Sequence, residues 1–282
     1  MCKYRYVYFF ILVFLFGFLG ADSIETEKST LLLNKYLAGS ARYCEKLKSE
    51  AYHFYCKEKI LLEKDDFIYG RLIKGKLTRR ISKKNYLFDY QIIQKRGKLQ
   101  ERRRLIADKV AKKESDPYTL NLLFLSEKAV FGPNSILDKE RQSNFNFKLL
   151  EYKKTGENDL VVIEAIPKKP GKIFFLSAEI YIDTTDFSVR KIVGPVYVSG
   201  YKSMKRIAAS YKSRLSLVCE IRFNHEYKGL FFPTFIYISE KYIGGSMIYR
   251  NVGPRGWERS KTIFTYSDYK FFEVGTEVKI QD

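Results

Sequence analysis

Apolar and polar positions alternate along much of the chain, most regularly in its second half. The stretch 172–193 reads KIFFLSAEIYIDTTDFSVRKIV, and every second residue from Phe174 to Ile182 is apolar. A period of two is typical of a strand with one buried face. The polar run from Asp183 to Asp186 favours a turn, because short polar side chains bond to their own backbone. The pattern predicts a long antiparallel hairpin.

Similar runs predict strands along most of the remaining chain. They lie at 52–62, 86–92, 98–105, 145–152, 160–166, 215–223, 230–238, 261–266 and 269–278. Pro233 cannot donate to a ladder, so we expect a bulge or an unpaired side there. Tight turns join most of the strands, about ten in all, which predicts an antiparallel meander.

One convincing helix is predicted, and it precedes the strands. Apolar and aromatic residues recur at spacings of four and seven, at Leu32, Tyr36, Tyr43 and Leu47. That spacing indicates one buried stripe on a helix that starts at Ser29 or Thr30 and runs to about Glu50. Residues 22–30 are polar, and we expect them to be irregular.

Residues 107–147 are the least regular part of the chain. We expect a short helix or strand at 118–124, a turn at 132–134 and a helical turn at 137–142. A region of this kind can form a lid or plug, although an ordinary connection is the more common case. Residues 196–210 are mixed and basic, and no element is predicted there.

The first residues are typical of a secretory signal peptide. A basic start precedes an uncharged, largely apolar run at 7–19, and Gly20 and Ala21 follow it. A retained membrane anchor is the alternative, although a span needs about 20 apolar residues. We expect a cleaved signal at 1–21 and a single domain at 22–282, located in the periplasm or secreted.

The formal net charge is +19 at pH 7, which favours anionic partners. Export argues against nucleic acid, so we expect an anionic membrane surface or an envelope protein. A solvated basic surface without a dedicated partner is the alternative. The chain is expected to be a monomer.

Three cysteines follow the signal segment, and two of them could pair. Cys44 and Cys56 cannot bridge within one continuous helix, where 12 residues separate them by about 18 Å. They could bridge if the helix ends and a strand folds back, so we predict a Cys44–Cys56 disulfide, with two reduced buried thiols as the alternative. Cys219 lies on the apolar face of its strand and is expected to be an inert free thiol.

Recognisable catalytic and cofactor motifs are missing from the sequence. The two histidines stand outside any zinc-binding spacing, and neither a nucleophile elbow nor a phosphate-binding glycine loop is found. Asp183 and Asp186 could act as acid and base, but turn formation explains both. Trp257 lies in an expected loop, as a packed anchor or as a contact to a ligand or membrane. We therefore predict a protein without cofactor or enzymatic activity.

The predicted strands are long, and the chain has 22 Phe and 22 Tyr. Together they indicate a strongly curved sheet with a concave apolar face, which is where hydrophobic ligands bind. The helix and loops could instead fill this face completely. The predicted lining residues are Phe174, Leu176, Ile180, Leu217, Ile221, Phe232 and Ile236.

Several motifs, taken in order, carry a family resemblance. They are RYCEKLK at 42–48 with FYCKE at 54–58, FDYQ at 88–91, YIDTTDFSVRKI at 181–192, GLFFPT at 229–234 and YSDYKFF at 266–272. This order resembles exported bacterial proteins of the outer-membrane lipoprotein-sorting, LolA-like group.

The resemblance implies a mainly β fold, an unclosed antiparallel barrel whose open side is covered by helices. It also implies a carrier of lipid or lipoprotein acyl chains, or a sensor of envelope lipids. A protein-interaction or stress-sensing module on the same scaffold is the alternative function. A hydrolase using Asp183 and Asp186 is a remote third.

Overall fold

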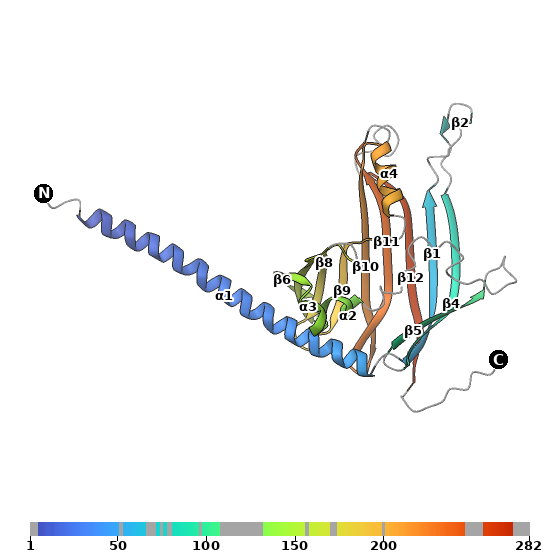
Figure 1. Cartoon of the computed structure of the whole chain (residues 1–282), viewed down its shortest axis with the longest axis horizontal. Helices are drawn as coiled ribbons and strands as arrows, with labels where there is room; N and C mark the ends of the chain where they lie inside the picture. The colour runs from blue at the N-terminus through green and yellow to red at the C-terminus, as the bar shows by residue number, and fades with distance from the viewer. Residues whose placement is uncertain are drawn as a thin grey trace.

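The computed structural model describes residues 5–50, 53–65, 72–73, 76–77, 81–95, 98–107, 132–155, 158–169, 174–198, 201–245 and 256–272. Most of its strands form one ten-stranded antiparallel sheet (Figure 1). Its strands are β1 (His53–Asp65), β4 (Ile81–Lys95), β5 (Lys98–Ala107), β6 (Phe145–Thr155), β7 (Asn158–Pro167), β8 (Ala178–Asp183), β9 (Val189–Pro195), β10 (Arg214–Tyr227), β11 (Leu230–Ile243) and β12 (Trp257–Phe271). A separate hairpin joins β2 (Leu72–Ile73) to β3 (Lys76–Leu77).

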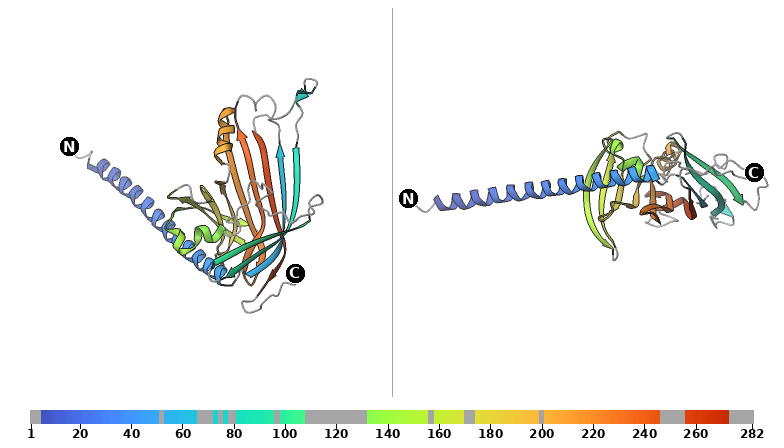
Figure 2. Two further views of the ribbon diagram at one scale, coloured as in Figure 1. Left: turned by 45° about the vertical axis from the view of Figure 1, so that its right-hand side comes forward. Right: turned by 90° about the horizontal axis from the view of Figure 1, so that it is seen from below.

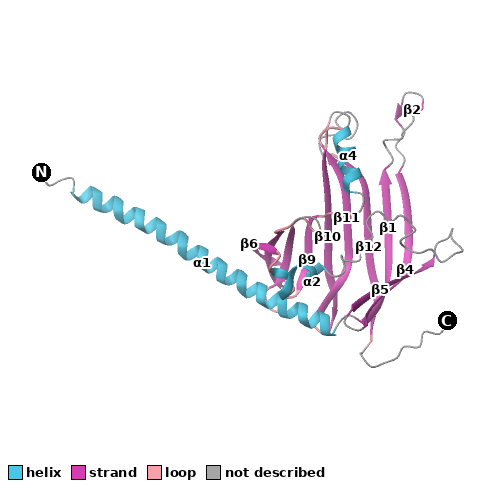
Figure 3. Ribbon diagram, in the orientation of Figure 1, coloured by secondary structure: helices cyan, strands magenta, loops and turns pink. Residues whose placement is uncertain are grey.

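The sheet has the order β5-β4-β1-β12-β11-β10-β9-β8-β7-β6. Strands β6 to β12 follow one another as the predicted meander. The prediction of a simple meander is wrong for β1, because this first strand lies between β12 and β4 and pairs with both. The described strands β5 and β6 are the two ends of the order, so the curved sheet does not close (Figure 3). This confirms the predicted unclosed antiparallel barrel.

One register row crosses the sheet through nine of its ten strands. From β4 to β6 it contains Tyr86, Ile60, Phe264, Ile236, Ile221, Ile192, Ile180, Ile163 and Leu149. Directly paired residues point to the same face of a sheet. All of them except the half-buried Leu149 are buried, so the row is the centre of the concave apolar face.

The described residues also form four helices, and Figure 2 shows two further views of their arrangement. They are α1 (Arg5–Glu50), α2 (Gly132–Leu137), α3 (Lys139–Gln142) and α4 (Tyr201–Ser210). Tyr36, Tyr43 and Leu47 of α1 pack into the same core as the sheet, which confirms most of the predicted stripe. In the described part of the chain, no helix combines the length and apolarity needed to cross a membrane.

The predicted start of the first helix is wrong, because α1 already includes residues 22–30. That segment lacks Gly and Pro, so nothing in its sequence stops a helix.

The predicted turn at 132–134 is also wrong, because α2 begins there. Pro133 is compatible with this position, since a first-turn residue needs no intrahelical N–H bond. The helical turn at 137–142 is confirmed by α3, whereas 118–124 lies outside the described residues.

Two further expectations need correction near the end of the chain. Strand β12 is continuous from Trp257 to Phe271, where two strands and a loop at Trp257 were predicted. The break in the pattern is a bulge instead, with Asp268 at a φ of 56° and a register shift against β1. The expected irregularity at Pro233 is confirmed by register shifts between β10 and β11.

The opening hairpin forms, but its first strand is shorter than predicted. Strand β8 starts at Ala178, and residues 174–177 are bent apart from an isolated bridge at Phe175. As a result Phe175 is buried, whereas Phe174 and Leu176 are half-buried. The carboxylates shape the turn as expected: Asp183 Oδ1 accepts the N–H of Thr185 at 2.9 Å, and Asp186 makes the equivalent bond to Ser188.

The turn of this hairpin docks on α1. Phe187 has a φ of 61° and lies against Gly39, where a Cβ atom would be only 2.2 Å from Phe187 Cδ1. Tyr36 adds an aromatic contact to the same ring, with the centroids 6.0 Å apart. Gly39 is therefore a point of close approach that fixes α1 against the turn between β8 and β9.

We predict that Gly39→Ala destabilises the protein by about 1–3 kcal/mol, because the added methyl overpacks against Phe187. Helix propensity alone would favour alanine by about 1 kcal/mol. Urea unfolding of the variant measures the difference. In a Phe187→Ala background the same change should be neutral or stabilising. Stabilisation in the wild-type background would contradict the contact.

Candidate functional site

The concave face of the sheet contains the predicted ligand-lining residues. Ile180, Leu217, Ile221, Phe232 and Ile236 are all buried, at no more than 4% exposure. Phe174 and Leu176 are half-buried at its margin. The structure thus brings five of the seven residues together on one continuous apolar face, and it shows that this face is covered.

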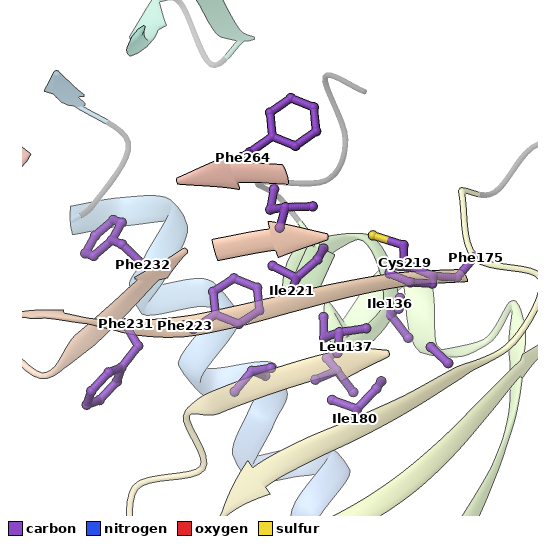
Figure 4. Packing of buried hydrophobic residues seen from close by; sticks show 14 of the residues in the cluster. Ile136, Leu137, Phe175, Ile180, Cys219, Ile221, Phe223, Phe231, Phe232 and Phe264 are labelled. Atoms are coloured by element: carbon purple, nitrogen blue, oxygen red, sulfur yellow. The ribbon is translucent and has the colours of Figure 1, made fainter. Parts of the chain in front are cut away.

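Helix α2 covers the middle of the face. Its residues Ile136 and Leu137 are fully buried and point into the core beside Ile180 and Ile221 (Figure 4). At the start of α2, a Cβ on Gly132 would lie 3.0 Å from Ile192 Cδ1 and 3.5 Å from Ile221 Cδ1. A short helix therefore fills the centre of the concavity, directly over the row that crosses the sheet.

Polar contacts attach α2 and α3 to α1. Lys48 forms an ion pair with Asp138, which lies between the two short helices. The side-chain amide of Gln142 donates to the carbonyl oxygen of Leu37 in α1 at 2.9 Å, and to that of Leu137 at the end of α2 at 2.8 Å. These contacts hold the cover to α1, so that burial of Ile136 and Leu137 is its main attachment to the sheet itself.

Aromatic side chains line the inner face at the end of the sheet where β10 turns into β11. Phe54 and Phe232 are buried, whereas His225, Tyr227 and Phe271 remain half-exposed. The rings of Tyr227 and Phe271 stack with centroids 3.9 Å apart. Partial burial lowers the pKa of His225. We call these five residues the aromatic end, the place where the inner face meets solvent.

A buried charged network lies on the same face near the edge strand β5. Arg103 Nε donates to Glu58 Oε2 at 2.7 Å, and its Nη2 lies 2.8 Å from Glu101 Oε1. Tyr266 donates to Glu58 at 2.9 Å and Tyr90 to Glu101 at 2.6 Å. Glu58 and Arg103 side chains are 0% and 3% exposed. Sequence reasoning missed this network, although Glu58 stands on the otherwise apolar side of its strand.

Two carboxylates face one guanidinium in this network, and this affects their protonation. Burial alone would lower the pKa of Arg103, but Glu58, Tyr90 and Glu101 raise it far above its usual range. Burial also raises the pKa of Glu101, whose Oε2 atom has no hydrogen-bond partner. The stability of this buried network therefore depends on whether Glu101 is protonated.

The predicted Cys44–Cys56 disulfide is wrong, since both residues are free, buried thiols. The chain does turn back between α1 and β1 as expected, but the two side chains have different surroundings. Burial and the charge of Asp138 raise the pKa of the Cys44 thiol. Cys56 lies on the sheet, and burial raises its pKa as well. Cys219 is a buried free thiol, as predicted.

Few candidate catalytic or metal-binding groups are found among the residues that the structure describes. Within the described ranges, no group of three or more His, Cys, Asp or Glu residues is placed to hold a metal ion. Asp183 accepts from Arg190 at 3.1 Å as well as from the turn backbone, so it serves the hairpin. Trp257 is buried and donates its Nε1–H to Asp65 at 3.0 Å, which makes it a packed anchor.

No protein-family model matches the chain, and no curated protein matches its sequence. Among solved structures it is similar to a DUF1329 family protein from Desulfovibrio piger, with 11% identity, a TM-score of 0.41 and coverage of 86% of this chain and 94% of that one. It is similar to a LolA superfamily protein from Nitrosomonas europaea at 13% identity, a TM-score of 0.34 and coverage of 83% and 93%. It is also similar to a domain described as an outer membrane lipoprotein-sorting protein from Vibrio parahaemolyticus. The identity is 13%, the TM-score is 0.37, and the match covers 87% of this chain and 95% of that one.

The resemblance that the motifs predicted is thus also found among solved structures. At these identities and TM-scores no ligand or residue role transfers to this chain. The site described above stands on its own geometry.

We predict that Arg103→Met destabilises the fold by about 3–5 kcal/mol at neutral pH, because it leaves two buried carboxylates without their partner. Arg102→Met is the matched control on the same edge strand. Arg102 is exposed on the other face, so its removal should change stability by no more than about 0.5 kcal/mol. Equal effects in denaturant unfolding would contradict a buried network.

Glu101→Gln should change how stability depends on pH. A carboxyl whose pKa is raised by folding stabilises the protein below its unfolded pKa, and this contribution is lost as pH rises through the folded pKa. Glutamine has no such titration. The stability of the variant relative to wild type is therefore expected to increase from acidic to neutral pH. Urea unfolding at several pH values tests this, and a decrease would show that Glu101 is held ionised.

Proposed function

We propose that the protein is a non-enzymatic carrier or binding protein for a lipid or a lipoprotein acyl chain. The ligand would lie on the concave face, along the row that passes through Ile221 and Ile236. One observation carries the proposal: an apolar row nine strands wide is covered at its centre by a six-residue helix. The role agrees with the resemblance stated from the sequence, and an exported chain would perform it in the cell envelope.

An acyl chain can replace what α2 supplies. Ile136 and Leu137 fill the concavity with branched hydrocarbon, and a methylene chain offers the same kind of contact to the sheet. Burial of each methylene contributes about 0.8 kcal/mol, so a chain of ten carbons competes well with two side chains. The covered state is then the ligand-free form, in which α2 occupies the ligand's place.

The aromatic end offers a route to this face. Half-exposed rings at Tyr227 and Phe271 continue inward to Phe54 and Phe232. Cations stand at the same end: the ammonium of Lys228 lies 5.3 Å from the Tyr227 ring centroid, and Lys46 Nζ donates to the Lys228 carbonyl at 3.4 Å. An amphiphile could enter tail first and leave an anionic head group beside these lysines.

The test uses 11-(dansylamino)undecanoic acid, a fluorescent fatty acid, with Trp257 as the energy-transfer donor because it is the only tryptophan. We predict saturable binding to the wild-type chain. The double variant Ile136→Ala/Leu137→Ala should bind at least about tenfold more tightly, because each truncation weakens the competing cover by about 2–5 kcal/mol. Leu137→Ala alone is the milder variant if the double variant melts below the assay temperature.

Ser135→Ala is the matched control on α2. Its hydroxyl only donates to the Gly132 carbonyl at 2.8 Å, so binding should remain at the wild-type level. Equal or weaker binding by the Ile136 and Leu137 variants would show that the probe does not replace α2. Absence of binding in all folded variants would reject the carrier and favour the interaction or sensing module.

A further inference from the structure

The segment 197–214, around α4, has an unusually one-sided charge. It contains five cations and no acidic residue. The cations are Lys202, Lys205, Arg206, Lys212 and Arg214, which we call the α4 patch. All five side chains are exposed. The α4 patch therefore gathers five positive charges at one end of the sheet, where α4 lies (Figure 1).

The α4 patch is held in place by the opposite side of the helix. Met204 and Ala208 are buried, whereas Lys202, Lys205 and Arg206 fall on the other face at helical spacing. The turn into β10 is fixed by bonds from the backbone and side chain of Ser213 to the Ala208 carbonyl, at 2.9 and 3.1 Å. The cations thus project from a rigid support.

The α4 patch differs from the ion-paired parts of the surface that the structure describes. None of its five cations forms an ion pair with a residue that the structure describes. Several cations on the convex face of the sheet are instead neutralised locally, in the pairs Lys57–Asp89 at 2.5 Å, Lys153–Glu151 at 2.8 Å, Arg222–Glu220 at 2.6 Å and Lys261–Glu63 at 2.7 Å. An uncompensated patch attracts an external polyanion, whereas paired charges do not.

Tyrosines accompany the cations and indicate which polyanion. Tyr197 is 37% exposed and its ring lies 4.9 Å from that of Tyr201. The ammonium of Lys205 lies 5.2 Å from the Tyr201 ring centroid. Tyrosine is enriched at the level of lipid head groups, and clustered Lys and Arg are attracted to anionic leaflets.

We propose that the α4 patch docks the protein on an anionic phospholipid membrane surface. The helix lies on its support with its apolar side already buried, so docking is electrostatic and superficial, without insertion. The patch lies where β10 begins and β11 ends. The aromatic end lies at the other end of these two strands, where β10 turns into β11. This inference goes beyond the proposed ligand role and does not depend on it.

The experiment measures co-sedimentation of the full chain with phosphatidylcholine vesicles, with and without phosphatidylglycerol. The test variant is Lys202→Glu/Lys205→Glu/Arg206→Glu. The control is Lys59→Glu/Arg102→Glu/Lys148→Glu, which reverses three exposed cations elsewhere and has the same net charge. Thermal unfolding confirms that both are folded, and binding of the fluorescent fatty acid reports the concave face separately.

We expect the wild type to bind only the vesicles with phosphatidylglycerol, more weakly as salt increases. The α4 variant should bind at least about tenfold more weakly than the control, because each Lys or Arg near the surface contributes appreciably to binding. Equal loss in both variants would overturn the proposal, since net charge alone would then explain binding. So would a wild type that ignores these vesicles but binds a soluble polyanion such as heparin.

Discussion

The register of the row from Tyr86 to Leu149 is the constraint on which the structure depends. Eight antiparallel pairings must align so that one apolar side chain from each of nine strands points to the same face. A slip of one residue in any strand would turn its apolar side chains to solvent. Bulges at Pro233 and Asp268 absorb irregularities without shifting the row, because they lie away from it.

An apolar face of this extent has to be covered, and among the described residues the helices other than α1 are short. Helix α1 crosses the β6–β9 side and is fixed by the contact between Gly39 and Phe187. Helix α2 covers the centre with only Ile136 and Leu137 as large buried side chains. This imbalance between a rigid sheet and a short cover is what makes exchange of α2 for a hydrocarbon ligand physically reasonable. The charged network around Arg103 lies at the edge strand, where the sheet does not close.

Local patterns predicted the strands well, because alternation at residues such as Leu217, Cys219 and Ile221 depends only on which face is buried. The placement of β1 between β12 and β4 could not be predicted in this way, since pairing of the first strand with the last is a long-range choice. The same holds for Arg103 and Glu58, which are 45 residues apart. Helix α4 was missed because its apolar side is narrow, yet Tyr201, Met204 and Ala208 already had helical spacing. The disulfide prediction was wrong because a chain reversal between Cys44 and Cys56 does not determine where the two thiols point.

The central claim is that the concave face holds a hydrocarbon chain in place of α2. The most direct measurement is native mass spectrometry of the protein purified without detergent from the cells that make it. The account predicts a species heavier than the bare chain, from which denaturation releases an acylated molecule. A bare mass that stays unchanged when lipids are added would contradict it, because the concave face would then be permanently filled by α1 and α2.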